Sequence, residues 1–296
     1  MRVKGINYGL SLYSSYTLPL FDLEEVSGGF IFRKTHGAYR GLVCRFDKRS
    51  LETECKIPRY WSKEVAYKTL GLDKHFLYQK LASELDGKGL VDTITLMYSP
   101  SDKTVVAYTI YLSQNTSYHT NTVKWVRQLL ETGVIEARSY QVSWFMENKN
   151  LIRESTSLED PLEEAARLLT LRGVGVKGSQ AYLLYAHGLT EYAPLDRHYK
   201  TLVSEYLDLP PPDKNFCLRA FFNCEKCPLS GKCMYSRLRS RLGYFNGVLQ
   251  SIVYIAGSLK KGGSRGLVDV LVGGFEYLSD VLLDKASLYL GRRLST

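Results

Sequence analysis

The chain has 296 residues, 45% of them hydrophobic, which is enough for a substantial core and for two or three small domains or one large one. Its formal charge of +9 favours a polyanionic partner such as nucleic acid. Apolar runs such as Leu249–Ala256 fall well short of the roughly 20 residues of a membrane-spanning helix, so we expect no membrane partner. The N-terminus lacks the apolar core of a signal peptide, and we expect an intracellular protein whose thiols are reduced.

The first 57 residues carry a pattern typical of antiparallel β-structure. A Gly-Gly turn at 28–29 is followed by aromatic and β-branched runs at 30–33 and 41–46. Short runs of this kind between turn residues indicate strands. Cys44 and Cys55 fall in this region, apart from the later cysteines, and we expect them to be strand-packing residues.

After Pro58 the pattern becomes typical of helices. Apolar residues at helical spacing over 76–85 predict a helix that ends at Gly87. The apolar run 105–112 fits either a buried helix or a strand, and from there to about Leu209 helices dominate.

Three prolines at 210–212 form a stiff break before a cluster of cysteines. Beyond the cluster, residues 242–257 predict another buried helix, and residues 260–266 a basic, flexible connector. Residues 267–278 predict a final amphipathic helix.

A pair of helices joined by a glycine-rich turn is the most informative prediction. Asp160 can cap the first helix and Pro161 suits its first turn. Gly173 and Gly175 then separate it from a second helix over 177–187. Two glycines allow backbone amides to approach a phosphate at the positive end of the second helix, which holds DNA without reading its sequence. An ordinary tight turn between helices is the alternative.

Lys177 begins the second helix, and Asp196 follows it by 19 residues. The segments Leu171–Lys177 and Leu195–His198 resemble the helix-hairpin-helix glycosylase superfamily. Its bifunctional members, such as endonuclease III and 8-oxoguanine DNA glycosylase, have a Leu-Pro-Gly-Val-Gly-x-Lys hairpin and a Val-Asp-x-His segment. The resemblance implies that Lys177 is the nucleophile and Asp196 the essential carboxylate. It also implies that DNA is held by Gly173, Val174 and Gly175, while Arg172 replaces the usual proline.

These residue types suit the implied chemistry. Breaking a base–sugar bond builds positive charge on the sugar, which a nearby carboxylate stabilises. An amine that attacks C1′ gives a covalent intermediate, which opens to a Schiff base and permits strand cleavage by β-elimination. The alternative is that Lys177 only contacts a phosphate and that Asp196 only caps a helix.

Four cysteines late in the chain have the spacing C-x6-C-x2-C-x5-C. In a reducing compartment such a cluster favours a metal site over disulfides. The spacing equals that of the cluster loop of endonuclease III, which implies a [4Fe–4S] cluster, with zinc as the alternative. The implied role is to order a basic loop that meets DNA phosphates. The predicted ligands are Cys217, Cys224, Cys227 and Cys233.

The order of segments around the cysteines departs from endonuclease III. Here Cys217 follows Asp196 by only 21 residues, and a segment that resembles the helix normally before the cluster, 244–250, comes after it. The loop is therefore expected to have a different position in the chain, which affects how it docks more than whether it binds a metal.

Other segments resemble the 8-oxoguanine and alkyladenine branch of the superfamily. They are the N-terminal β-region and residues 72–87. Residues 112–117 resemble the segment that fills the gap left by a flipped base, and Asn115 is the candidate for that role, with capping of the next helix as the alternative. The resemblance covers most of residues 20–257 and is strongest at 171–198 and 217–233.

The expected fold is α+β, with an N-terminal antiparallel sheet region, a mostly helical glycosylase body and an iron–sulfur cluster loop. The expected parts are the sheet region at 1–57, the glycosylase domain at 58–209, the cluster loop at 210–240 and C-terminal helices at 241–296.

The expected function is that of a monomeric, bifunctional DNA N-glycosylase and AP lyase. It would act on double-stranded DNA that contains an oxidised base, with 8-oxoguanine as the first choice. The alternatives are an endonuclease III-like enzyme for oxidised pyrimidines, a monofunctional glycosylase, and a non-catalytic iron–sulfur protein that binds DNA.

Overall fold

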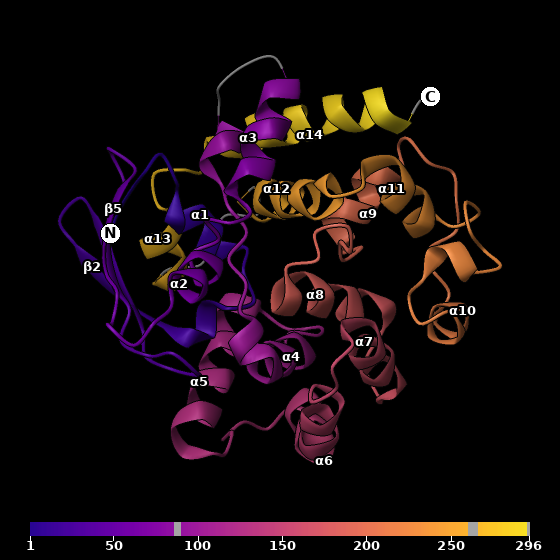
Figure 1. The fold of residues 1–296 in the computed structure, drawn as a ribbon, viewed down its shortest axis with the longest axis horizontal. Helices are drawn as coiled ribbons and strands as arrows, with labels where there is room; N and C mark the ends of the chain where they lie inside the picture. Colours follow the sequence, from indigo (N-terminus) through magenta and orange to yellow (C-terminus); the bar gives the residue numbers. More distant parts are fainter. Residues whose placement is uncertain (86–89, 260–265, 295–296) are drawn as a thin grey trace.

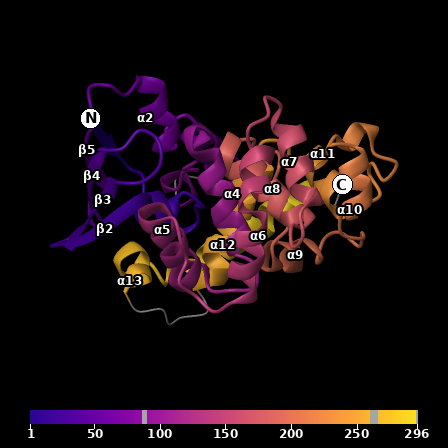
Figure 2. The ribbon, with the colours of Figure 1, turned by 90° about the horizontal axis from the view of Figure 1, so that it is seen from below.

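The computed structural model describes residues 1–85, 90–259 and 266–294. It contains a five-stranded antiparallel sheet beside a larger helical body (Figures 1 and 2). This arrangement confirms the predicted α+β class. The strands, in the spatial order β1-β5-β4-β3-β2, are β1 (Arg2–Lys4), β5 (Glu52–Lys56), β4 (Val43–Asp47), β3 (Gly29–Lys34) and β2 (Phe21–Val26).

The helices of the described residues begin within the sheet region and continue to the C-terminus. They are α1 (Tyr8–Tyr13), α2 (Lys63–Thr69), α3 (His75–Glu84), α4 (Lys103–Leu112), α5 (Val123–Thr132), α6 (Tyr140–Ser155), α7 (Pro161–Thr170), α8 (Val176–His187), α9 (Arg197–Val203), α10 (Lys214–Arg219), α11 (Met234–Leu242), α12 (Phe245–Leu259), α13 (Leu267–Val272) and α14 (Leu278–Leu294).

The inner face of the sheet is aromatic. Phe30 lies opposite Phe46 in the β3–β4 register, and their ring centroids are 5.2 Å apart. Tyr8 of α1 packs on Phe32 at 5.4 Å, and every residue of α1 is buried. The prediction of β-structure throughout the first 57 residues is therefore incomplete, because α1 covers the sheet that the following strands form.

Cys44 and Cys55 are buried in strands, as predicted, but they form a disulfide, so the expectation of reduced thiols is wrong for this pair. They lie directly opposite each other in the antiparallel register of β4 and β5, with their Cα atoms 4.1 Å apart. Alternation along one strand shows which face a side chain takes, but the partner across the sheet depends on the register.

In the later part of the chain, the structure decides one ambiguous prediction and corrects another. The apolar run 105–112 is helical and lies in α4. The predicted final helix is two helices, α13 and α14, because the chain turns at Gly274, which has a φ of +87°. The predicted helix end at Gly87 lies outside the described residues, as does the predicted connector 260–266 apart from its last residue.

Helix α12 forms the centre of the helical body, and most of its residues are buried. In Figure 1 it runs between α3 and α14 on one side and α8 and α9 on the other. Two polar contacts fix it: Ser251 lies 2.9 Å from the hydroxyl of Tyr78 on α3, and Asn246 accepts a hydrogen bond from Tyr199 on α9 at 2.8 Å. Helices α3 and α9 are thus joined to one buried helix.

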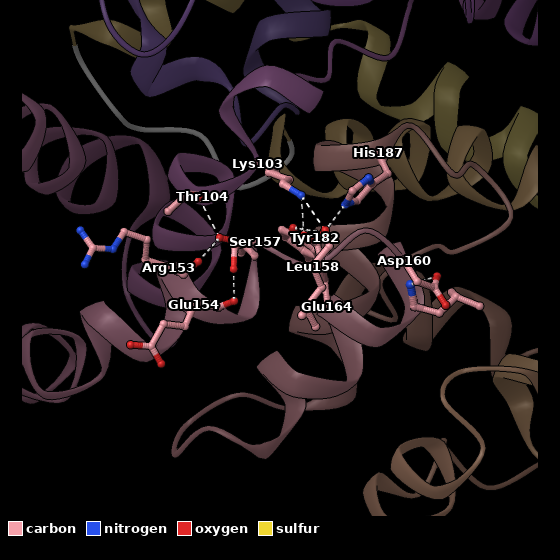
Figure 3. A network of polar contacts seen from close by, with 12 residues as sticks. Lys103, Thr104, Arg153, Glu154, Ser157, Leu158, Asp160, Glu164, Tyr182 and His187 are labelled. Atoms are coloured by element: carbon pink, nitrogen blue, oxygen red, sulfur yellow. Dashed lines mark hydrogen bonds and ion pairs between the residues drawn. The ribbon is translucent and has the colours of Figure 1, made fainter.

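A buried carboxylate joins three helices of the body (Figure 3). Glu164 on α7 is fully buried and accepts hydrogen bonds from Lys103 of α4 at 2.5 Å and from Tyr182 of α8 at 2.6 Å. His187, at the end of α8, lies 2.8 Å from the same carboxylate. The network holds α7 and α8 at a fixed angle, which also fixes the turn between them.

No helix within the described ranges is long and apolar enough to cross a membrane.

The Glu164 network is expected to give a pH-dependent part of the stability. Burial raises the pKa of Glu164, but hydrogen bonds from His187, Lys103 and Tyr182 lower it more, so the folded-state pKa lies below the ordinary 4.5. This contribution is present above pH 4.5 and is lost as the pH falls through the folded-state pKa. Glu164→Gln should lower the free energy of unfolding by about 2 kcal/mol near neutral pH, and by less in acid.

Urea unfolding between pH 3 and 7 would measure this difference. Glu163→Gln is the matched control, because Glu163 is the exposed neighbour on the same helix. A stability difference between wild type and Glu164→Gln that stays constant with pH would contradict the role given to the carboxylate.

Candidate functional site

The turn between α7 and α8 has the form that the sequence predicts. Asp160 caps α7 by accepting a hydrogen bond from the amide of Leu162 at 2.9 Å, and α8 ends at the left-handed Gly188. Gly173 has a φ of +85°, a conformation that strains residues with a side chain. Val174 is 7% exposed and anchors the turn in the core. The turn is therefore held in one conformation.

Two carbonyl groups of this turn are hydrogen-bonded to side chains from other helices. The carbonyl of Arg172 accepts a hydrogen bond from the hydroxyl of Tyr111 at 2.7 Å. The carbonyl of Val174 accepts one from Nζ of Lys214 at 2.9 Å.

Most amide groups of the same turn are free; that of Val174 is the exception, because it donates to the carbonyl of Leu171 at 3.2 Å. Within the described chain, no hydrogen-bond acceptor faces the backbone amides of Gly173, Gly175, Val176 and Lys177. Free amides at the N-terminus of a 12-residue helix make a site for an anion such as a phosphate.

Lys177 and Asp196 line the same cleft, which has a volume of about 780 Å³. Lys177 is the second residue of α8 and is exposed, whereas Asp196 is 7% exposed. A smaller recess below the cleft is lined by both residues and by Gln250 of α12. The fold therefore brings together an amine and a carboxylate that are 19 positions apart in the sequence.

Asp196 has a separate partner for each carboxylate oxygen. Oδ1 accepts a hydrogen bond from the amide of Tyr199 at 3.0 Å and so caps α9. Oδ2 accepts one from Nε2 of Gln250 at 2.6 Å, while Oε1 of Gln250 is buried without a partner in the described chain. Helix capping and a role in the cleft are thus compatible, because the cap uses one oxygen and the other lies toward the recess that both residues line.

Aromatic side chains form one wall of the cleft. Tyr13 and His119 are stacked at 4.2 Å with an interplanar angle of 12°, and Tyr254 lies 6.2 Å from Tyr13. The sequence interpretation did not include these residues. His119 lies just after the segment 112–117, in a π-helical turn (Tyr118–Thr122) that no local pattern reveals.

His119 is a neutral hydrogen-bond acceptor at neutral pH. Burial lowers its pKa to about 4, against a smaller opposing effect of the carbonyl of Tyr13. Its Nε2 lies 2.9 Å from that carbonyl, so Nε2 carries the hydrogen and donates it. Nδ1 is then unprotonated and can accept a hydrogen bond from a molecule in the cleft.

His198 also lines the cleft and packs against α12. Burial lowers the pKa of His198; the charge of Asp196 opposes this shift, and the charges of Arg197 and Lys177 reinforce it. The ring fits only because residue 257 is glycine: a Cβ there would lie 2.3 Å from Nδ1 of His198. His198 therefore packs between α12 and the residues around Asp196.

Asn115 lies at the edge of the same cleft. It is exposed, has a φ of +52°, and its Nδ2 donates to the hydroxyl of Tyr140 at 3.3 Å. The alternative that it caps the following helix is wrong, since Ser117 is the residue at that cap. Asn115 is free to contact a molecule that enters the cleft.

The four late cysteines are free thiols on and around α10 and the start of α11. Burial raises the pKa of Cys217 to about 12, and the other three thiols add to the shift because they lie close by. Four soft sulfur donors fit an iron–sulfur cluster or zinc. In the part of the chain that the structure describes, however, no three histidine, cysteine, aspartate or glutamate side chains are placed as a metal site.

Arg239 of α11 supports the cysteine loop from the side of the helical body. Its guanidinium donates to the carbonyl of Phe222 at 3.3 Å and stacks on the ring of Tyr192 at 4.4 Å. It also lowers the pKa of Cys224, which burial raises. A cation beside these sulfurs would favour their thiolate forms.

Comparison with known proteins finds likeness in structure only. No family model matches the chain, and no curated protein matches its sequence. A Clostridium acetobutylicum 8-oxoguanine glycosylase/lyase in complex with dsDNA containing cytosine opposite 8-oxoG superposes with a TM-score of 0.59 at 11% identity, over 88% of this chain and 94% of that one. MBOgg1 in complex with a low-affinity DNA ligand has a TM-score of 0.58 at 11% identity and the same coverages.

The apo form of the Clostridium enzyme gives a TM-score of 0.55 at 12% identity, over 86% of this chain and 93% of that one. These likenesses confirm the helix-hairpin-helix glycosylase fold that the resemblance implied.

The close packing of His198 against Gly257 leads to a prediction. Gly257→Ala should push the imidazole out into the cleft, where its pKa rises toward the ordinary 6.5, because burial lowers it in the wild type. NMR titration of the histidines would measure the shift. His75 on α3 is the internal control, since burial lowers its pKa as well and it lies on another helix. An unchanged titration of His198 would contradict the packing described.

Proposed function

We propose that the chain is a DNA glycosylase with AP lyase activity, which removes an oxidised base from double-stranded DNA and then nicks the strand. One observation carries the proposal: Lys177 directly follows the free amides of the turn and shares a cleft with Asp196. Phosphate binding at the turn would hold the backbone, and a base turned out of the duplex would enter the cleft.

The two side chains divide the reaction between them. As the bond from C1′ to the base nitrogen breaks, positive charge develops on the sugar, and the carboxylate of Asp196 stabilises it. The neutral amine of Lys177 forms a bond to C1′, and the base leaves with the electron pair and takes up a proton. The sugar ring then opens to a Schiff base, loss of a 2′ proton expels the 3′ phosphate, and the strand is cleaved.

8-Oxoguanine is the base that we favour. The structural neighbours include a complex with this base, and the N-terminal β-region of the sequence resembles that branch of the superfamily. Oxidation at C8 also turns N7 of guanine from an acceptor into an N–H donor. Nδ1 of His119 is an acceptor that lines the cleft and could pair with that donor.

The cysteine loop suggests a cofactor and a second candidate base. We propose that Cys217, Cys224, Cys227 and Cys233 hold a [4Fe–4S] cluster with a structural role, supported by their spacing and by the four soft donors. The same spacing in endonuclease III makes oxidised pyrimidines the alternative substrates.

Borohydride trapping tests the chemistry directly. Duplexes that carry 8-oxoguanine, thymine glycol, uracil or an abasic site are incubated with the protein and reduced, and a covalent adduct is expected on the 8-oxoguanine duplex. Lys177→Ala should abolish the adduct, whereas Lys200→Ala, an exposed lysine on α9, should retain it. Asp196→Asn preserves a residue that can cap α9 but removes the charge, and should slow base release by about 10²-fold or more.

Each other result of this assay points to an alternative. Base release without an adduct indicates a monofunctional glycosylase, and an adduct on thymine glycol alone indicates the pyrimidine enzyme. DNA binding without either activity indicates a non-catalytic protein and overturns the proposal.

The cluster has an independent test in metal analysis. Protein purified without oxygen should contain about four irons and four sulfides per chain. Cys227→Ser should lower the iron content, whereas Cys44→Ser, in the sheet, should leave it unchanged. About one zinc per chain in place of iron would overturn the assignment.

A further inference from the structure

Four side chains form a continuous row from the cleft edge to the α7–α8 turn, which we call the α6 strip: Asn115, Tyr140, Trp144 and Arg172. Asn115 donates to the hydroxyl of Tyr140, and the ring of Tyr140 meets Trp144 edge-on at 5.0 Å. The guanidinium of Arg172 lies over the ring of Trp144 at 4.3 Å. Tyr140 and Trp144 are four residues apart in α6 and therefore share one face of that helix.

Arg172 takes part in no ion pair among the described residues. Its side chain is exposed, and no carboxylate among the described residues lies within ion-pair distance of it. Its main-chain carbonyl is fixed by Tyr111, whose hydroxyl also accepts a hydrogen bond from Asn148 at 3.3 Å. The residue is thus held at its backbone by one contact and at its guanidinium by another.

Stacking on Trp144 restricts the guanidinium without neutralising it. An exposed arginine normally loses considerable rotamer freedom when it binds a ligand. A guanidinium that already lies over an indole at 4.3 Å has lost part of this freedom, and it keeps the fork of N–H groups that matches phosphate oxygens. Arg172 also directly precedes Gly173, the first free amide of the turn.

We propose that Arg172, oriented by Trp144, binds a DNA phosphate next to the one held by the turn amides. The α6 strip then connects this backbone contact to Asn115, the candidate for filling the gap left by the flipped base. The inference rests on the proposed DNA binding, but not on base excision. The competing explanation is that Arg172 only covers the apolar surface of Trp144.

The test measures binding of the full chain to an undamaged duplex by fluorescence anisotropy across a series of salt concentrations. Each phosphate contact contributes about 0.9 to the slope of log affinity against log salt. Arg172→Ala should reduce the slope by about 1. Arg45→Ala, which removes an exposed arginine from the sheet strand β4, should leave it unchanged. A slope in Arg172→Ala equal to that of the wild type would overturn the proposal.

The orienting role of Trp144 requires a double-mutant cycle. Trp144→Leu should weaken binding by roughly two- to five-fold when Arg172 is present, and should have no further effect in Arg172→Ala. Equal weakening in both backgrounds would mean that Trp144 contacts DNA itself, and would overturn the orienting role. Should Trp144→Leu fail to fold, Trp144→Phe provides the smaller ring for the same cycle, with an intermediate loss expected.

The outcomes separate this inference from the proposed function. A wild type that does not bind DNA overturns both. A wild type that binds, with an unchanged slope in Arg172→Ala, overturns only the inference. Absence of trapping or base release does not affect the salt slopes, since the duplex contains no damaged base.

Discussion

The rest of the site depends on one constraint in the α7–α8 turn: carbonyl groups are hydrogen-bonded within the protein, whereas most amide groups have no partner among the described residues. The carbonyls of Arg172 and Val174 are bonded to Tyr111 and Lys214, whereas the amides of Gly173, Gly175, Val176 and Lys177 have no partner in the described chain and are left for a ligand. If the turn rotated, the carbonyls would face the ligand and repel an anion. The hydrogen bonds of Tyr111 and Lys214 oppose this rotation, and the buried Glu164 of α7 joins the two helices that flank the turn through its hydrogen bond with Tyr182 of α8. A network remote from the cleft therefore supports the electrostatic character of its edge.

Asp196 combines a structural role with the geometry that the proposed chemistry requires. Its Oδ1 caps α9, and its Oδ2 meets Gln250 beside the recess. Because α12 is buried among α3, α9 and α14, the amide of Gln250 is held on a rigid element. The carboxylate therefore has little freedom to turn away from the cleft. This is the pre-organisation that stabilising a developing positive charge requires.

Features of the site that depend on the preferences of single residues, such as helix capping, could be predicted from the sequence. Asp160 and Gly188 bound the helices of the hairpin where their capping preferences place them. Contacts between distant segments could not, because no local pattern encodes them: the Gln250–Asp196 hydrogen bond spans 54 positions. The disulfide of Cys44 and Cys55 was missed for the same reason, since it depends on strand register.

Replacement of the usual proline by Arg172 changes how the turn is made rigid. A proline stiffens a turn through its own ring, independently of the surrounding structure. Here the stiffness comes from distant side chains: Tyr111 on α4, Trp144 on α6 and Lys214 on α10. Lys214 lies on the same short helix as Cys217, so any metal that orders the cysteine loop would also hold the lysine that fixes the carbonyl of Val174. The proposed cluster would then support DNA binding through the hairpin as well as through its own basic residues.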